Sequence, residues 1–499
     1  MIIHSLRMDG IVQTLHQIGA FIYQWYWIPL LLVYVAIIVT ILIENRNPTK
    51  TIAWIMVIVF VPVIGILIYY FFGQKFKKIK IFRIQNREKH IRLLRVWDRL
   101  DPIMDHNLEV LKQSIGPLSR VFAFLKNQRI APPSLHNHVE LLINGEKKFP
   151  ELFRAIREAT HHVHLEYYIF DPDDTGLALI ALLEERASAG VTVRVIADAF
   201  GSPKLRRQRK RFAKAGIEFI PFMPVTFTSL ANGNYRNHRK IAVIDGHTAF
   251  VGGINISDRY TNNGRYPLYW RDTAVKIQGD AVNVLQAHFW MNWHLAEGRP
   301  FNLRDGYFHT TPARPVGGAA VSFAFSDPGS NAPYNMEAML IGIAEAEHTV
   351  SICTPYFIPS EELSTTLQLA AASGVRVELM LPAQSDSYIV QHASFSFLKP
   401  LLERGVIVYL YEKGFLHAKT ICIDGRLAYI GTVNLDIRSF YINFEVSAVI
   451  NDLGLCSQLD AQFEKDKADS TLMTRDVWMQ RPRWKRGMDS LCRLLTPLL

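Results

Sequence analysis

The pattern of hydrophobic positions divides the chain into two parts of different character. Residues 27–43 and 51–72 are almost wholly apolar, and runs of that length can cross a bilayer as helices. The short polar link at residues 44–50 predicts a helical hairpin, and aromatic residues such as Trp27 and Tyr69 stand where interfacial belts are expected. We therefore predict an N-terminal segment of residues 1–26 followed by a two-helix transmembrane hairpin at residues 27–73.

The flanking charges predict the orientation of this hairpin. Seven lysines and arginines lie between residues 75 and 89, against two in the link, so the positive-inside rule places both ends of the hairpin in the cytoplasm. A cleaved signal peptide fits poorly, because the first apolar run begins late, lacks a strongly basic leader and is followed by a second run. A pair of buried core helices is the remaining alternative. Residues 74–134 are expected to form a basic, partly amphipathic juxtamembrane connector.

After the connector, β-prone runs alternate with helical segments, and the alternation occurs twice. Residues 155–165 match residues 342–352 as a helix end that leads into a strand, and residues 189–195 match residues 373–379 as a helix, a glycine stop and a buried strand. Such alternation predicts an α/β fold. We expect two similar lobes, residues 135–312 and 313–499, with mixed sheets flanked by helices and a pseudo-twofold axis between them.

One short motif is also duplicated. A histidine, a lysine two residues later and an aspartate five residues after the lysine occur first as His238, Lys240 and Asp245. The second copy is given by His417, Lys419 and Asp424. Each copy is followed at the same distance by a small-residue step and an asparagine, Asn255 and Asn434. Two copies with matching tails indicate a duplicated site for phosphodiester chemistry.

Each copy has the sequence of a β-hairpin. Both β-prone runs end in Asp-Gly, a strong signal for a two-residue turn. With Asp245 in that turn, residue 238 pairs with residue 253 and the histidine, lysine and asparagine of one copy share a face. In the second copy residue 417 pairs with residue 432 in the same way. The motif aspartates lie far along the strand from the lysines, so we expect Asp245 and Asp424 to serve the turns and not to act as general acids.

The residue types define the chemistry of the candidate catalytic set. One histidine can attack phosphorus and carry a covalent intermediate, while the other protonates the leaving alkoxide and later deprotonates the acceptor. Two lysines and two asparagines can stabilise charge on the non-bridging oxygens. A single copy supplies half of this set, so the two copies must face each other.

The paired motifs resemble those of the phospholipase D superfamily, over residues 135–499. Flanking segments are more specific: residues 235–240, 354–359, 434–440 and 443–445 resemble bacterial cardiolipin synthases, as do residues 48–54 and 61–65 of the N-terminal region. The resemblance implies that the histidines converge between the lobes, that one becomes phosphohistidine, and that neither a metal nor another cofactor is required. It also implies that Asp272 and Glu445 orient the histidines, and it favours His238 as nucleophile and His417 as acid/base, although the near-symmetry of the copies leaves the reverse assignment open.

Composition agrees with an anionic partner. The net charge is +10 and 49% of the residues are hydrophobic, which is high for a soluble enzyme. The densest basic run, residues 204–214, suits anionic lipid or a solvated helix face, and it lacks the interleaved aromatic residues of a nucleic-acid site. The four cysteines are scattered and show neither disulfide nor metal-site spacing.

These observations predict a cardiolipin synthase of the bacterial cytoplasmic (inner) membrane, with its lobes on the cytoplasmic side. It would transfer a phosphatidyl group between two phosphatidylglycerol molecules and release glycerol. A membrane phospholipase D that uses water as acceptor is the nearest alternative, and the sequence separates the two poorly. A membrane-tethered nuclease is less favoured, because a nuclease has no need to sit at lipid depth, and an inactive binding protein is disfavoured because both motifs are intact.

Overall fold

A computed structural model describes residues 23–25, 27–43, 48–61, 64–69, 101–224, 234–298, 305–308 and 316–496. The chain forms two compact units, Met1–Ile79 and Lys80–Leu499. We describe each unit by itself.

The N-terminal unit consists of apolar helices. They are α2 (Trp27–Ile43), α3 (Pro48–Phe60) and α4 (Ile64–Ile68), and Ile41, Ile58 and Tyr69 form a small buried cluster among them. Among the described residues one helix, Tyr23–Ile43, combines the length and the apolar character that a bilayer crossing requires.

The second apolar run differs from the single straight helix that the sequence predicts. The rings of Trp54 in α3 and Tyr69 after α4 lie 5.4 Å apart, although a continuous helix would separate them by about 22 Å. The chain therefore reverses near Val61. A proline follows Val61 in the sequence, and the residue before a proline disfavours helical backbone. Because residues 44–47 and 70–72 lie outside the described part, the second crossing stays a prediction.

The larger unit contains two lobes with the same strand order. The strands form one 15-stranded sheet, and counting outward from its centre each lobe repeats the same sequence of strands. In the first lobe the order is β1 (Ser134–Ile143), β8 (Thr273–Gln278), β6 (Thr248–Gly252), β5 (Lys240–Ile244), β2 (His162–Tyr167), β3 (Thr192–Asp198) and β4 (Glu218–Phe222). In the second lobe it is β9 (Ala319–Ser326), β18 (Glu445–Asn451), β16 (Leu427–Gly431), β15 (Thr420–Ile423), β10 (Thr349–Cys353), β12 (Arg376–Pro382) and β13 (Ile407–Tyr411), with β19 (Ser470–Met473) added at the edge. The prediction of two similar α/β lobes is confirmed.

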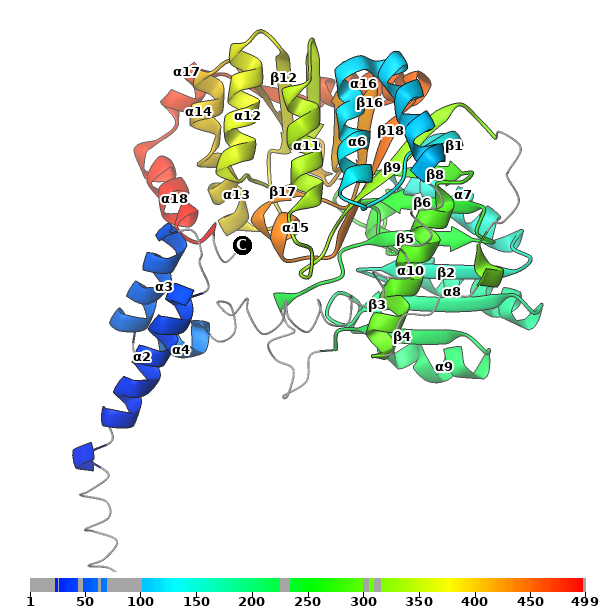
Figure 1. Cartoon of the computed structure of the whole chain (residues 1–499), viewed down its shortest axis with the longest axis horizontal. Helices are drawn as coiled ribbons and strands as arrows, with labels where there is room; N and C mark the ends of the chain where they lie inside the picture. Colours follow the sequence, from blue (N-terminus) through cyan, green and yellow to red (C-terminus); the bar gives the residue numbers. More distant parts are fainter. Residues whose placement is uncertain are drawn as a thin grey trace, which may run out of the picture. The chain divides into compact units, whose positions relative to one another are not determined.

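Helices cover the strands of both lobes. In the first lobe α7 (Asn144–Arg157) and α8 (Asp174–Ser188) pack into one buried cluster, whereas α10 (Val282–Glu297) contacts β4, β5 and β6 and contributes to the cluster that joins the lobes. In the second lobe α11 (Tyr334–Ala344) and α12 (Glu361–Ala372) lie side by side with α6 (Ser119–Asn127) on one face, as Figure 1 shows, and α16 (Leu453–Ala468) packs against other strands. The predicted connector therefore contributes to this lobe, since Leu111, Ile115 and Phe122 are buried in its core.

The two lobes meet through apolar strand faces. Side chains of β5, β6 and β8, including Val243, Val251 and Val275, form one buried cluster with Ile430 and Val446 of β16 and β18. Main-chain pairing adds to this contact, because β7 (Trp270–Arg271) pairs with β14 (Phe415–Leu416). A second bridge joins residue 237 to residue 444. The shared apolar cluster and the strand pairing fix the lobes against each other and bring the ends of both motif strands together.

Candidate active site

Both motif hairpins contain the expected Asp-Gly turn but pair in a shifted register. Asp245 and Asp424 have left-handed backbone with φ of 53° and 52°, as the turn requires. The ladder pairs residue 244 with 248 and residue 423 with 427, so one extra residue, His247 or Arg426, bulges beside each turn. The predicted partners 238–253 and 417–432 are therefore wrong by one residue. The same bulge occurs in both copies, so the pseudo-symmetry is kept.

The motif aspartates lie at these turns and not with the other candidate residues. Asp245 accepts hydrogen bonds from the backbone N–H groups of Thr160, His161 and His162 at 2.8–2.9 Å. Asp424 accepts the equivalent three bonds from residues 347–349. Burial opposes ionisation of Asp245, yet these amide bonds outweigh it and lower the pKa of its carboxyl. Each aspartate thus ties a hairpin turn to the start of a neighbouring strand.

His238 is held by the other lobe. Its Nδ1 lies 3.0 Å from both carboxylate oxygens of Glu445, which is fully buried in β18. Oε2 of Glu445 also accepts a 2.5 Å hydrogen bond from the Thr432 hydroxyl. The neighbouring Arg239 is buried and donates to the backbone oxygens of Glu445 and Ser326 at 3.1 and 3.2 Å. These contacts fix the imidazole, the carboxylate and the lobe interface as one unit.

His417 is held in the reciprocal way. Its Nδ1 lies 2.6 Å from Oδ2 of Asp272, a fully buried residue of the first lobe. The backbone N–H of His417 donates to the carbonyl of Arg271 at 2.7 Å, and the rings of Trp270, Phe415 and Tyr260 surround the imidazole at centroid distances of 5.6–5.9 Å. The structure thus brings both carboxylates that the resemblance singled out into contact with the histidines, each across the lobe boundary.

The residue two positions before the asparagine differs between the two motif copies: it is Gly253 in the first and Thr432 in the second. A Cβ on Gly253 would lie 2.1 Å from Oδ1 of Asp272, so this position accepts no side chain while Asp272 keeps its place. The matching residue of the second copy is Thr432, whose hydroxyl binds Glu445. The shorter carboxylate therefore faces a glycine and the longer one faces a threonine.

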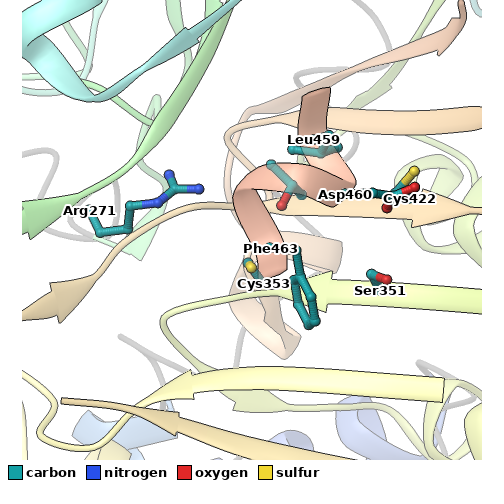
Figure 2. Close-up of a pocket in the computed structure, with 8 residues that line it drawn as sticks. Arg271, Ser351, Cys353, Cys422, Leu459, Asp460 and Phe463 are labelled. Carbon is teal, nitrogen blue, oxygen red and sulfur yellow. The ribbon is translucent and has the colours of Figure 1, made fainter. Parts of the chain in front are cut away.

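The segment around Asp272, which lies between β7 and β8, is anchored from its other side. Side chains alternate along a strand, so the neighbouring Arg271 points away from His417 and pairs with Asp466 of α16 at 2.8 Å. Figure 2 shows this arginine with residues of α16, β10 and β15 around a small cavity, which is lined by Arg271, Ser351, Cys353, Thr420, Cys422, Leu459, Asp460 and Phe463. None of the predicted site residues lines this cavity.

The motif lysines are buried beside the histidines. Nζ of Lys240 donates to the backbone oxygen of His238 at 2.6 Å, and Nζ of Lys419 donates to that of His417 at 2.5 Å. Burial lowers the pKa of both ammonium groups, that of Lys419 to about 8, while nearby carboxylates including Asp272 oppose the shift. Each lysine also acts electrostatically on the histidine of the other lobe, so the two half-sites share one electrostatic environment.

The predicted phosphate-binding asparagines have unequal surroundings. Asn255 already accepts from the backbone N–H of Ile169 at 3.0 Å and donates to the Tyr260 hydroxyl at 2.7 Å. Asn434 is buried, and its side-chain oxygen has no hydrogen-bond partner. The contacts of Asn255 therefore hold together the segments around Ile169 and Tyr260. Binding of phosphate by Asn255 and Asn434 stays a proposal.

The histidine pKa values reflect the closed surroundings. Burial and the charge of Lys419 lower the pKa of His417 to about 3, although Asp272 acts in the opposite direction. Burial also lowers the pKa of His238, and the charge of Glu445 opposes that shift. A phosphodiester anion between the two rings adds negative charge, which raises both pKa values and favours protonation of one imidazole.

Two further residues at the site were not predicted. Tyr168 lies against His238 with ring centroids 5.0 Å apart and has Lys240 over its face. Lys148 of α7 is buried, donates to the carbonyl of Ile254 at 2.6 Å, and lies over the ring of Tyr167. Burial lowers the pKa of Lys148 to about 7. Nothing in the local sequence marks either residue, because both come from segments that precede the motif by many residues.

The comparison with protein families decides the assignment. The profile of the family described as "Cardiolipin synthase, PLD-like domain" matches residues 152–293 and 339–467, which contain both motifs and both carboxylates. The chain belongs to the cardiolipin synthase family. The profile described as "Phospholipase_D-nuclease N-terminal" matches residues 30–74, the apolar hairpin region.

Relatives of this family align along nearly the whole chain. Cardiolipin synthase of Geobacillus kaustophilus is 38% identical over 469 residues, which cover 94% of this chain and 92% of that protein. The major cardiolipin synthase ClsA of Bacillus subtilis is 34% identical and covers 93% of this chain, with 96% of its own length matched. As a member of the cardiolipin synthase family, the chain is an enzyme of the phospholipase D superfamily.

A solved structure supports the fold. The phosphatidylserine synthase of Haemophilus influenzae superposes with a TM-score of 0.58 and 15% identity, covering 76% of this chain and 100% of that one. This similarity concerns the fold alone. Among the described residues, no group of three or more histidine, cysteine, aspartate or glutamate side chains is arranged to hold a metal ion.

Proposed function

We propose that this enzyme transfers a phosphatidyl group from one phosphatidylglycerol molecule to a second, giving cardiolipin and glycerol. His238 is the nucleophile and His417 the acid/base. Because Nδ1 of each histidine faces a carboxylate, Nε2 is the nitrogen that serves the substrate.

In the first step Nε2 of His238 attacks phosphorus of the donor lipid. The bond from phosphorus to the glycerol oxygen breaks, and the protonated His417 gives its proton to that oxygen. Glycerol leaves, and a phosphatidyl group remains on His238. The imidazolium character that develops on His238 is stabilised by the buried carboxylate of Glu445.

In the second step a hydroxyl group of another phosphatidylglycerol takes the place of glycerol. Neutral His417 accepts the proton of that hydroxyl, its oxygen attacks phosphorus, and the bond from phosphorus to His238 breaks. One phosphodiester is exchanged for another, so the reaction requires no energy carrier and is reversible. Lys240 and Lys419 stabilise charge on the non-bridging oxygens in both steps.

The observation that carries the proposal is the crossed pairing of histidines and carboxylates. His238 depends on Glu445 and His417 depends on Asp272, so each half of the site is completed by the other lobe. This arrangement supports a mechanism in which the two imidazoles take opposed roles at one phosphorus atom. The names of the related proteins support cardiolipin as the product.

We further propose that the enzyme works at the bacterial cytoplasmic membrane, with both N-terminal apolar runs inserted and the lobes on the cytoplasmic side. The apolar helix Tyr23–Ile43 supports insertion, and the basic residues between 75 and 89 support the orientation. The anionic lipid of that membrane then both surrounds the N-terminal helices and serves as the substrate.

A single reaction tests this function. Purified enzyme in detergent–lipid micelles receives labelled phosphatidylglycerol without metal or nucleotide, and His238→Ala serves as the control. Cardiolipin and glycerol formed in equal amounts, only with intact His238, is the expected result. Phosphatidic acid in place of cardiolipin would mean that water is the acceptor and that the enzyme is a phospholipase. Absence of both products would overturn the proposal for this substrate.

A further inference from the structure

The C-terminal helix α18 (Arg483–Arg493) carries an apolar stripe that faces away from the protein. Trp484, Leu491 and Leu494 are exposed by 63%, 58% and 74%. Trp484 and Leu491 are seven residues apart, which places them on one side of the helix axis, and Leu494 follows at the C-cap of the helix. Large apolar side chains that share one exposed face mark a contact surface and not a core.

Positive charge flanks this stripe. Arg483 and Lys485, the two neighbours of Trp484 in the sequence, are exposed, whereas Arg493 lies on the other side of the helix, over the ring of Phe397. The single acidic residue of α18, Asp489, is buried, where it contacts His392 at 2.6 Å and Arg481 at 2.8 Å. The exposed surface of the helix is therefore apolar along one line and basic beside it.

The opposite face of α18 holds the helix rigidly on the second lobe. Cys492 is buried in a cluster with Ile358 and Ala393, and Figure 1 shows α18 lying beside α13 (Tyr388–Phe395). The Asp489 contacts above tie α18 to α13 and to the preceding turn. A helix anchored in this way presents its outer stripe as a fixed surface.

The same cluster connects α18 to the candidate active site. Ile437, which packs into it, lies between Asp436 and Arg438 in the segment that follows Asn434. Ile358 belongs to β11 (Phe357–Ile358), which pairs with β17 (Leu435–Asp436). The buried face of α18 is thus connected to the site segment through one cluster of side chains.

We propose that the outer face of α18 docks on the surface of an anionic bilayer, with Trp484, Leu491 and Leu494 inserted among the lipids and the basic residues at the headgroups. Exposed apolar residues beside basic ones are what a helix at the surface of an anionic bilayer requires. This inference rests on the proposed function in one respect, that the substrate is a membrane lipid. Docking there brings the segment at Asn434 close to the source of that lipid.

The test places a probe on the helix in the full chain. Leu491→Cys carries a nitroxide spin label in proteoliposomes of phosphatidylglycerol and phosphatidylcholine, and collisions with oxygen and with a water-soluble nickel chelate report depth. Leu369→Cys is the matched control, because Leu369 is an exposed leucine (64%) on α12 of the same lobe. The four native cysteines are buried, so labelling is directed to the introduced residue.

The expected result is a label at 491 that collides with oxygen and is shielded from the chelate, while the label at 369 is open to the chelate. The shielding should weaken severalfold in vesicles of phosphatidylcholine alone. A label at 491 that is as open to the chelate as the one at 369 would overturn the proposal. Shielding of the label from both oxygen and the chelate would contradict membrane docking and indicate that a second copy of the chain covers α18. Equal shielding in both vesicle types would contradict the preference for anionic lipid.

An activity measurement complements the depth measurement. In proteoliposomes of the same composition, Leu491→Glu is expected to lower the rate of cardiolipin formation about tenfold, whereas Leu369→Glu leaves it unchanged. Equal values for the two variants would contradict docking through α18. Because the spin-label measurement needs no turnover, a failure of the proposed reaction is distinguishable from a failure of the proposed surface.

Discussion

Nδ1 of His417 lies 2.6 Å from Oδ2 of Asp272, and the two residues belong to different lobes. The reciprocal contact joins His238 to Glu445 at 3.0 Å. Each motif histidine therefore finds its carboxylate partner in the other lobe. A carboxylate at Nδ1 orients the ring and stabilises its protonated form, so substitution of either carboxylate reports on the role of its histidine.

Substitution Asp272→Asn is expected to lower the rate of cardiolipin formation about 10²- to 10⁴-fold, because the charge that supports protonated His417 is lost. The defect should shrink when the donor is a phosphatidyl ester of p-nitrophenol, whose departing group needs no proton. The measurement compares the two donors by product analysis and by p-nitrophenol release. Glu445→Gln is the matched control: it removes support from the nucleophile, so its defect should persist with both donors. Equal rescue of both variants would contradict the assigned roles.

The variant His417→Ala should accumulate a covalent adduct. With the p-nitrophenyl ester the first step proceeds without an acid, whereas the second step lacks its base. We expect a burst of one p-nitrophenol per chain and a phosphatidyl group on His238, identified by mass spectrometry of peptides prepared without acid. His238→Ala should give neither. An adduct on His417 in the His238→Ala enzyme would reverse the two roles.

Gly253→Ala is expected to reduce turnover about 10- to 100-fold, because the new methyl group meets Oδ1 of Asp272 at 2.1 Å and displaces the carboxylate from His417. The melting temperature in detergent should change much less than the rate. Gly318→Ala serves as control, since a Cβ there meets nothing within 4 Å. Unchanged turnover in Gly253→Ala would show that Asp272 tolerates displacement.

Asp245→Ala should destabilise the fold by roughly 1–3 kcal/mol and leave the turnover of the folded enzyme nearly unchanged, because the variant removes the acceptor of three backbone hydrogen bonds. The pKa of Asp245 is lowered in the folded state, so its contribution is present above the unfolded pKa of about 3.9 and is lost as the pH falls through the folded value. Denaturant unfolding of the two proteins at pH 7 and at decreasing acid pH measures the difference in stability, which should shrink as the pH falls. A large loss of turnover at full stability would instead place Asp245 in the chemistry.

The duplicated motif shows which structural features can be predicted from residues that are close in the sequence. Three predicted features are present in the structure: the placement of each motif lysine beside its histidine, the Asp-Gly turn, and the alternation of helices and strands. Each of them depends on residues that are close in the chain. The predicted pairing register of the hairpin is wrong by one residue, because nothing in the turn sequence indicates the extra residue His247. The reversal of the second apolar run near Val61 was likewise missed, although the proline that follows was in view.

The sequence by itself determined the two-lobed α/β plan, the identity of the motif residues and the structural place of Asp245 and Asp424. Hydrogen-bonding turns and side-chain periodicity are short-range properties, so they can be read from neighbouring positions. Only the tertiary structure decided that His238 lies against Glu445 and His417 against Asp272, that Lys148 and Tyr168 join the site, and that α18 turns an apolar face outward. These relations depend on how two apolar strand faces pack, and that packing is set by contacts between residues hundreds of positions apart.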